Sequence, residues 1–460
     1  MSRSMLKDRQ FLKMLVTLML PMVAQNLITL AAQMMDSLML GRLGQIELSA
    51  SSLANQPFFI FNLLIFGMAS GSSVLNAQFW GKGDVRSIKI VISICLKVAL
   101  TVSILLGAAV IIFPETVMRI YTDDPEIIAA GAEYLKIVGF CYFFFGLSNT
   151  LLTTIRSVGI VRIAVIDSIF SLVCNSGLNY LLIFGSFGFP KLGIRGAAIA
   201  TVIARMGEAV IVLVYILVID RKLRFKIRDF WEFDVGLLKN YLKNGLPVAF
   251  NEVLWSVGIS IQSMVMGRLG ASVVSASQIA SIVQQFSSVL IFGVANAAAI
   301  IIGNDIGAGK MERARERVTW FRIIGVILGI FASCLILGLS GPVVSFYNVP
   351  EETKQLATEM LRVLAVIVLF VAQTGIGVVG LLRGGGDPRF ALFVDLAGLW
   401  LVATPAALLS AFVFGAPVLV VYACTKLDEP VKLLMLAWRM RNHHWMRDVT
   451  GEGAPQQLDN

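Results

Sequence analysis

The sequence predicts an all-α integral membrane protein of about twelve transmembrane helices in two homologous six-helix halves. Three observations predict this fold class. Hydrophobic residues make up 57% of the 460 residues and charged residues only 15%, and mean hydropathy is +0.81, which is too apolar for a surface that meets water everywhere. Apolar runs of about twenty residues, enough to cross the hydrocarbon core, recur along the chain. The second half of the chain also repeats the first.

The apolar runs follow one another with short breaks, and each is long enough to be a membrane-spanning helix. The predicted spans are residues 14–38, 53–78, 90–113, 128–154, 163–185, 196–219, 240–265, 278–303, 319–341, 356–382, 391–413 and 416–438. The most charged break, Asp220 to Asp234, lies between the sixth and seventh spans. We therefore expect an N-terminal lobe at residues 1–225, a cytoplasmic linker at 226–239 and a C-terminal lobe with a short cytoplasmic tail at 240–460. Residues 11–35 have no small-residue cleavage site behind them, so they predict a retained helix.

The basic residues predict the orientation in the membrane. The formal net charge is +9, and the bases gather in alternate breaks. The rich breaks carry Arg3, Lys7, Arg9 and Lys13, then Lys82, Arg86 and Lys89, then Arg156 and Arg162, then Arg221, Lys222, Arg224, Lys226 and Arg228, then Lys310, Arg313, Arg315 and Arg317, then Arg383 and Arg389, then Arg439, Arg441 and Arg447. The positive-inside rule places both termini in the cytoplasm of a cell-membrane protein. A nucleic-acid partner is not expected, because it needs bases on one water-facing surface.

An internal repeat links the two halves. The stretch from Pro21 to the Gly-Arg-Leu-Gly at 41–44 returns from Pro247 to the Gly-Arg-Leu-Gly at 267–270, an offset of 226 residues. The same offset relates Gly67 to Gly293, Ala69 to Ala295, Gly81 to Gly307 and Gly83 to Gly309. Two copies with an even number of spans share one orientation, and such parallel repeats place a substrate cavity between the halves. The duplication favours a transporter over a passive scaffold.

Enzyme chemistry and bound cofactors are not expected. The five cysteines lie in or near apolar runs, with no CxxC spacing and no clustering with the two histidines, as is typical of buried small side chains. The glycine loops at 81–83 and 307–309 lack the Gly-Lys-Ser/Thr ending of a phosphate-binding loop. No hydrolase triad or zinc-site spacing is present.

Several motifs resemble those of the multidrug and toxic compound extrusion (MATE) transporters, from about Pro21 to Trp445. They are Pro21, Met35-Asp36-Ser37, the loops at 41–44, 81–84 and 383–387, the stretch from Asn175 to Gly185, and the stretch from Leu192 to Thr201. The resemblance implies two six-helix lobes forming a V around a central cavity. It also implies secondary active antiport, in which organic, cationic or amphipathic drugs leave in exchange for H⁺ or Na⁺. We expect a monomer in the bilayer.

Asp36 is the first candidate for the coupling residue. It is the one charged residue in the run from Met14 to Leu40, and an acid inside a span costs a few kcal/mol unless it faces a cavity, a cation or a polar partner. A helix-end aspartate hydrated from the next loop is the alternative. The repeat places Gln262 at the equivalent position, so the fold accommodates a neutral amide there.

The fifth and sixth spans supply partners for Asp36. Asn175 and Asn179 are four residues apart and share a helix face. The resemblance implies a cation-coupling site of Asp36, Asn175, Asn179, Thr201 and the Ala197 carbonyl. Related branches carry an aspartate where this chain has Asn179, so one fixed negative charge remains. Na⁺ could bind the oxygens of Asp36, Asn175, Asn179 and Thr201, H⁺ coupling stays open, and the asparagines could instead only join helices.

The C-terminal half offers secondary candidates, Glu252, Gln262 and Asp387. Glu252 lies near the start of the seventh span, about where the resemblance implies an essential glutamate in another branch of the family, but closer to Pro247 than expected. Asp387 and Asp395 flank the predicted start of the eleventh span, where a helix N-terminus stabilises carboxylates. Other charged residues in or near spans are expected to pair or to snorkel, namely Lys97, Arg205, Glu208, Lys426, Asp428 and Glu429.

A flippase for a lipid-linked saccharide or a related lipid is the alternative function. It would share the plan of two lobes. We would expect it to carry more basic residues facing the cavity, and often extra helices. The sequence leaves the physiological substrate open.

Overall fold

The computed structural model confirms the all-α prediction. It describes residues 9–43, 45–345, 347, 349–441 and 445–450, in which all regular structure is helical. Ten of the described helical segments are long and apolar enough to cross a membrane, or eleven if one bent pair counts as a span. Two compact units are present. The N-terminal unit comprises Ala24–Asn76 and Asp84–Ala249, and the C-terminal unit comprises Met1–Val23, Ala77–Gly83 and Phe250–Asn460.

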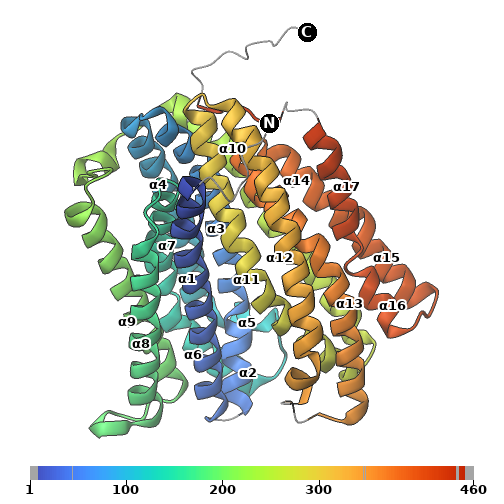
Figure 1. Cartoon of the computed structure of the whole chain (residues 1–460). Helices are drawn as coiled ribbons and strands as arrows, with labels where there is room; N and C mark the ends of the chain where they lie inside the picture. The colour runs from blue at the N-terminus through green and yellow to red at the C-terminus, as the bar shows by residue number, and fades with distance from the viewer. Residues whose placement is uncertain (1–8, 44, 346, 348, 442–444, 451–460) are drawn as a thin grey trace. The chain divides into compact units, whose positions relative to one another are not determined.

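Helices α1, α3 and α10 each contribute to both units, so the boundary between the units is not a single point in the chain. The sequence-based lobe boundaries remain a prediction. The helices up to the middle of the chain are α1 (Arg9–Gly41), α2 (Gln45–Ala54), α3 (Gln56–Lys82), α4 (Val85–Ile112), α5 (Pro114–Arg119), α6 (Pro125–Val138), α7 (Cys141–Arg156), α8 (Arg162–Phe184), α9 (Ile194–Val214) and α10 (Val235–Arg268). Helices α8 and α9 lie side by side (Figure 1).

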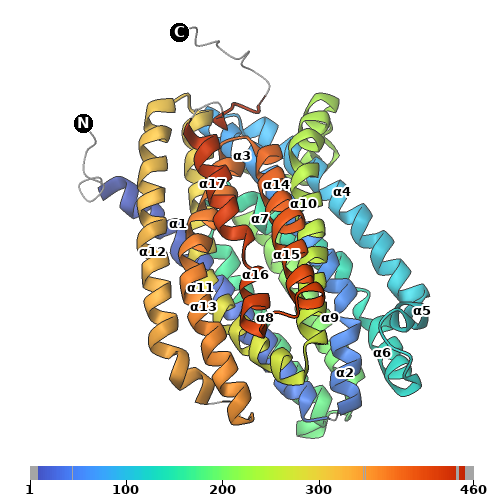
Figure 2. The same cartoon turned by 90° about the vertical axis from the view of Figure 1, so that its right-hand side faces the viewer.

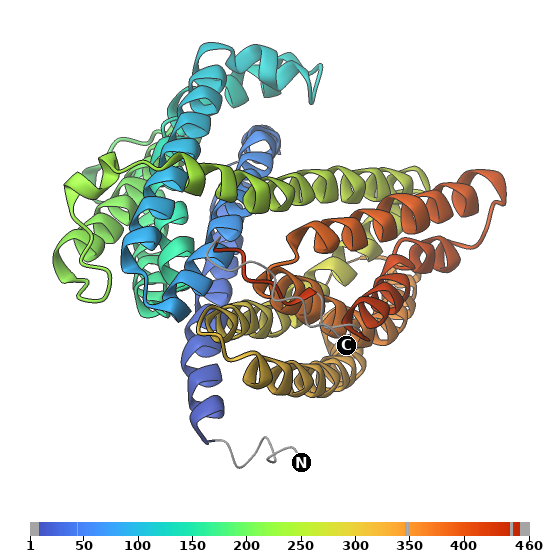
Figure 3. The same cartoon turned by 90° about the horizontal axis from the view of Figure 1, so that it is seen from above.

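The fourth predicted span, 128–154, is not one straight helix. Helices α6 and α7 meet at an angle of 51°. Helix α4 approaches this break closely, because a Cβ atom on Gly107 would lie 3.0 Å from the carbonyl oxygen of Gly139. Short α5 turns the chain back between α4 and α6 (Figures 2 and 3). No proline marks the break, which explains why the hydrophobic pattern did not predict it.

The charged segment between the halves packs on the N-terminal unit. Lys89 Nζ on α4 lies 2.8 Å from the Asp229 carboxylate and 2.9 Å from the Arg224 carbonyl oxygen, and Ser93 Oγ donates to the Phe230 carbonyl at 2.7 Å. Burial raises the pKa of Asp229, but the Lys89 ammonium and the Lys226 N–H lower it by more, so the pKa lies below its ordinary value. The segment is therefore held against α4.

The C-terminal unit continues with long helices and then with shorter, broken ones. They are α11 (Ala271–Gly307), α12 (Met311–Ser345), α13 (Glu351–Gly375), η5 (Ile376–Arg383), α14 (Pro388–Leu396), η6 (Ala397–Ala403), α15 (Thr404–Leu408), η7 (Leu409–Val413), α16 (Val418–Cys424) and α17 (Asp428–Arg441). Helices α12 and α13 run side by side (Figure 2). The predicted twelfth span, 416–438, is divided between α16 and α17. With 7 and 14 residues, neither of these helices is long enough to cross a membrane alone.

The two repeat copies meet at a pair of glycines within the C-terminal unit. A Cβ atom on Gly81 would lie 2.2 Å from the Asn304 carbonyl oxygen, and one on Gly307 would lie 1.9 Å from the Gln78 carbonyl oxygen. Gln78 and Asn304 are themselves related by the 226-residue offset. The contact is thus reciprocal: equivalent residues of the two repeat copies make equivalent contacts at these ends of α3 and α11.

Residues 445–450 are fixed in the C-terminal unit, which the hydrophobic pattern did not indicate. Trp445 is fully buried, and a Cβ atom on Gly385 would lie 2.3 Å from its ring. The side-chain amide of Gln78 makes two hydrogen bonds to the backbone of this segment. Its Nε2 donates to the Arg447 carbonyl at 2.9 Å, and its Oε1 accepts from Val449 N at 2.7 Å. This segment therefore joins the end of α3 to the loop before α14.

We predict that Gly307→Ala destabilises the protein. The added methyl would overlap the Gln78 carbonyl, and overpacking of this kind costs about 1–3 kcal/mol. The measurement is the thermal unfolding midpoint of the purified protein in detergent. Gly338→Ala is the matched control, because no atom lies within 4 Å of its Cβ position and alanine favours the helix. Equal midpoints for the two variants would contradict the close crossing.

Candidate functional site

The five predicted cation-coupling residues form one hydrogen-bonded chain in the N-terminal unit. The Asn179 amide donates to Asp36 Oδ1 at 2.8 Å and to Asn175 Oδ1 at 3.0 Å. The Asn175 amide donates to Thr201 Oγ1 at 3.3 Å. The Thr201 hydroxyl in turn donates to the Ala197 carbonyl at 2.9 Å. The structure therefore brings all five residues together.

Helix periodicity explains why the chain is continuous. Asn175 and Asn179 are one turn apart on α8, and Ala197 and Thr201 are one turn apart on α9, so each pair occupies one face of its helix. The two helices lie side by side (Figure 1). Asp36 reaches Asn179 from α1, where it is the last residue of the segment Arg9–Asp36 that is long and apolar enough to span a membrane.

The site contains an oxygen that no hydrogen bond satisfies. Asn179 is fully buried, both bonds of its amide nitrogen are to neighbours in the site, and its Oδ1 has no hydrogen-bond partner. A buried unpaired acceptor costs about 1–3 kcal/mol. Together with Asp36, Asn175 and Thr201 it supplies the hard oxygen ligands that a small cation prefers. The residue set therefore fits either a proton on Asp36 or a sodium ion as the transported cation.

Two residues near Asp36 have roles that the sequence did not indicate. Tyr134 on α6 is buried, its hydroxyl is 3.5 Å from the Asn55 amide nitrogen, and it lies within electrostatic range of Asp36. Arg205 on α9, which the sequence predicts to pair or to snorkel, is paired with Glu208. Its guanidinium lies 5.1 Å from the centre of the Phe145 ring, and its positive charge acts on Asp36.

The secondary candidate Glu252 lies in a network of ion pairs in the C-terminal unit. Its carboxylate accepts from Arg383 Nη1 at 2.9 Å, and Arg383 Nη2 lies 3.7 Å from Asp395. Asp395 also accepts from the Asn251 amide at 2.8 Å. Lys432 extends the network, with its Nζ 3.8 Å from Asp395 and 2.6 Å from Asp428. Positive charges thus face these carboxylates.

The other secondary candidates occupy different surroundings. Gln262 is buried on α10 with its Nε2 unpaired, and it is ten residues beyond Glu252, or about 15 Å along the helix. Asp387 is the N-cap residue of α14, but its carboxylate makes no capping hydrogen bond. It accepts from Arg439 Nε at 2.9 Å and Nη2 at 2.5 Å instead. Asp387 therefore lies at a helix N-terminus, as expected, but its hydrogen bonds are to Arg439 and not to the backbone of α14.

Asp395 also differs from its expected place. It is the next to last residue of α14, not a residue at a helix start, and it pairs within the network of Arg383 and Lys432. The other charged residues pair with neighbours of their own. The contacts are Lys97 with the Glu232 carbonyl, Lys426 with Gln284, Arg205 with Glu208, and Glu429 with Lys432 and Thr374.

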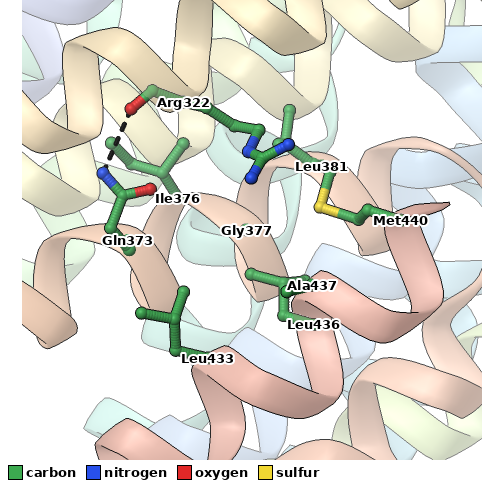
Figure 4. Close-up of a pocket in the computed structure, with 9 residues that line it drawn as sticks. All are labelled: Arg322, Gln373, Ile376, Gly377, Leu381, Leu433, Leu436, Ala437 and Met440. Carbon is green, nitrogen blue, oxygen red and sulfur yellow. Dashed lines mark hydrogen bonds between the residues drawn. The ribbon is translucent and has the colours of Figure 1, made fainter.

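A small pocket opens between α12, η5 and α17 in the C-terminal unit (Figure 4). Most of its lining is apolar, and Gln373 at its edge donates to the Arg322 carbonyl at 3.1 Å. None of the predicted site residues is among the nine that line it. Within the part of the chain that the structure describes, no three His, Cys, Asp or Glu side chains could hold a metal ion together.

Comparison with known proteins matches the repeat. A model of the MatE family matches residues 21–181 and again residues 247–409, two matches that begin 226 residues apart. "Probable multidrug resistance protein YoeA" of Bacillus subtilis is 26% identical over 85% of this chain and 84% of the relative. "Multidrug resistance protein PmpM" of Pseudomonas aeruginosa is 25% identical over 87% of this chain and 84% of the relative.

Solved structures share the fold. "Crystal structure of MATE in complex with MaL6" has a TM-score of 0.85 and 19% identity, covering 93% of this chain and 96% of that one. A structure described as a MOP superfamily transporter from Pyrococcus furiosus, with a binding pocket of reverse polarity, has a TM-score of 0.85 and 18% identity, covering 95% of this chain and 97% of that one.

Proposed function

The chain belongs to the multidrug and toxic compound extrusion family of transporters, and on that premise we propose that it is a secondary active antiporter that exports organic cations and amphipathic drugs in exchange for H⁺ or Na⁺. Membership makes it a multidrug efflux transporter and a multi-pass membrane protein rather than an enzyme. The names of the relatives support drugs as substrates in preference to a lipid-linked saccharide.

The surroundings of Asp36 carry this proposal. Glu252, Asp387 and Asp395 each face an arginine or lysine, whereas Asp36 accepts its hydrogen bond from the neutral amide of Asn179. The charge of Arg205 acts on Asp36, but Arg205 is itself paired with Glu208, so Asp36 forms no ion pair of its own among the described residues. A carboxylate inside a span without an ion-pair partner is costly. A transported cation can supply that charge and then leave, whereas a fixed Arg or Lys cannot.

The coupling follows from this exchange of charge. With Na⁺ or H⁺ bound to Asp36 the site is neutral, so it does not attract a cationic drug electrostatically. Once the cation has left, the carboxylate attracts a positively charged drug. Because the two ligands stabilise opposite charge states of one carboxyl, binding of each opposes binding of the other, as antiport requires.

The choice between H⁺ and Na⁺ depends on the neutral oxygens. The unpaired Asn179 Oδ1, with Asn175 Oδ1 and Thr201 Oγ1, supports Na⁺. The hydrogen bond from Asn179 to Asp36 supports H⁺ equally well, since rotation of the amide would let its oxygen accept from a protonated carboxyl. We further propose that the protein works as a monomer in the cell membrane, with both termini in the cytoplasm.

We predict that Asp36→Asn abolishes gradient-driven export. The variant keeps a hydrogen-bonding side chain but has no charge to exchange. The measurement is accumulation of ethidium against its gradient in inverted membrane vesicles, with sodium and pH gradients imposed separately. Asp123→Asn, at an exposed acid before α6, is the matched control and should transport normally. If Asp36→Asn at normal membrane abundance still builds an ethidium gradient, Asp36 is not the coupling residue.

Asn179→Asp should change the ion dependence of export and keep transport. A second carboxylate 2.8 Å from the first raises the demand for positive charge at the site, because two like charges at that distance cannot both stay ionised without a cation. The measurement is the initial export rate as a function of pH and of sodium concentration. Asn175→Asp, one turn away, is the comparison. Identical pH and sodium profiles for Asn179→Asp and the natural protein would show that position 179 does not contact the cation.

The topology is tested by cysteine labelling in a chain whose five cysteines are replaced by serine or alanine. Arg228→Cys in the inter-half segment should react with a membrane-impermeant maleimide only after cells are permeabilised, because the basic breaks predict a cytoplasmic location. Lys191→Cys, in the exposed connection between α8 and α9, should react in intact cells. The reverse pattern would overturn the proposed orientation.

A further inference from the structure

We propose that Asp167, Arg205 and Glu208 form a second proton-binding site in the N-terminal unit, through which protons pass between Asp36 and the membrane side where α8 begins. This inference rests on the proposed function and commits it to the proton as the driving ion. Neither the repeat nor the comparisons assign a role to these three residues.

The three residues continue the line of the Asp36 site along the same pair of helices. Asn175 of α8 contacts Thr201 of α9. Asp167 precedes Asn175 by eight residues and Glu208 follows Thr201 by seven, so on these antiparallel neighbours both acids lie about 11–12 Å from that contact, in the same direction. Arg205 is one turn beyond Thr201, between the two sites.

Arg205 is firmly held where the two sites meet. Its Nη1 lies 2.9 Å and 3.1 Å from the two carboxylate oxygens of Glu208, and Glu208 is 3% exposed. The rings of Phe145 and Phe58 lie 5.1 Å and 6.0 Å from its guanidinium carbon. The charge of Arg205 acts on Asp36 and on Asp167 as well as on Glu208.

Asp167 is the acid that this arrangement leaves without a partner. It is 5% exposed, and its Oδ1 makes no hydrogen bond. Arg205 is paired with Glu208, so the three residues carry one excess negative charge when both acids are ionised. The remaining titratable groups that interact with them are Cys141 of α7, Cys174 of α8 and Asp36 of α1, and none is positive. One proton neutralises the set.

The proton transfer conserves charge. A proton leaves the carboxyl of Asp36 and protonates the Asp167 carboxylate; at this separation the transfer requires water as a carrier. The new Asp36 carboxylate is then drawn to Arg205, and Asp167 accepts the proton because it is the acid without a countercharge. Asp167 lies five residues from Arg162 at the start of α8, which the basic breaks place on the cytoplasmic side. Protons that enter from outside would therefore leave to the cytoplasm, and this inward proton movement drives outward transport of the drug.

The test uses full-length protein in liposomes, with ethidium as the substrate and a pH gradient as the only driving force. Asp167→Asn should lower export by at least about tenfold and flatten its pH profile, while ethidium–ethidium exchange without a gradient stays within about twofold. Asp167→Glu, which restores a carboxyl, should recover most of the export. Asp123→Asn is the matched control and should behave as the natural protein does.

A spectroscopic measurement keeps the inference testable if Asp167→Asn is poorly transported to the membrane. In Asp36→Asn protein labelled with ¹³C at the aspartate carboxyl, an infrared difference spectrum between acidic and neutral pH should still show a buried protonated carboxyl. That band should be absent from the Asp36→Asn/Asp167→Asn double variant. Its absence from the single variant, or its persistence in the double variant, would overturn the second site.

The outcomes separate this inference from the proposed function. If Asp36→Asn abolishes export but Asp167→Asn has the natural rate and pH profile, only the second site is wrong. If a sodium gradient drives export and a pH gradient does not, the proton route is wrong while Asp36 can still be the coupling residue. If Asp36→Asn still exports ethidium against its gradient, the proposed function itself fails.

Discussion

The hydrogen bond between the Asn179 amide and Asp36, 2.8 Å long, is the interaction on which the proposed cation site depends. It joins α1 to α8, and through Asn175 and Thr201 it extends to α9. It holds the carboxylate in place without neutralising it. A lysine or arginine at position 179 would stabilise the same helices more strongly by ion pairing, but it would leave no charge for a transported cation.

The two repeat copies have specialised differently at equivalent positions. The counterpart of Asp36 is Gln262, whose amide is buried and partly unpaired. The C-terminal unit instead concentrates its charges where α10, η5, α14 and α17 meet, and there Arg383 and Lys432 face the acids. Such a network is costly to break, because removing one partner leaves a buried charge unpaired. It is therefore well suited to holding broken helices together, and the exchangeable charge lies in the other unit.

The repeat was predictable from the sequence, and so was the set of residues at the site. Gly81 and Gly307 are related by the 226-residue offset, and both are glycine because their close crossing admits no side chain. Asn175 and Asn179 had to share a face because they are one helical turn apart. The assignment of these residues to a cation site came from the family resemblance. Their contact with Asp36 depends on tertiary packing, which the helical pattern alone does not predict.

Other features have no local signal. Tyr134 and Arg205 reach the site from elements that the hydrophobic pattern does not place near Asp36. The break at Gly139 depends on the approach of α4, and burial of Trp445 depends on Gln78, more than 360 residues earlier. Asp395 was expected at a helix start, but the helix begins earlier, at Pro388, and continues past it. Such contacts between residues far apart in the sequence depend on how the helices pack, which no local sequence pattern predicts.

The most direct measurement of the central claim is cation release on drug binding. Purified protein in weakly buffered detergent would be mixed with ethidium while a pH indicator records protons and ²²Na⁺ records sodium. We expect the natural protein to release about one cation for each ethidium bound, since one carboxyl serves both ligands. We expect the Asp36→Asn variant to bind ethidium and to release no cation. Equal release from the two proteins would contradict the claim that Asp36 carries the exchange.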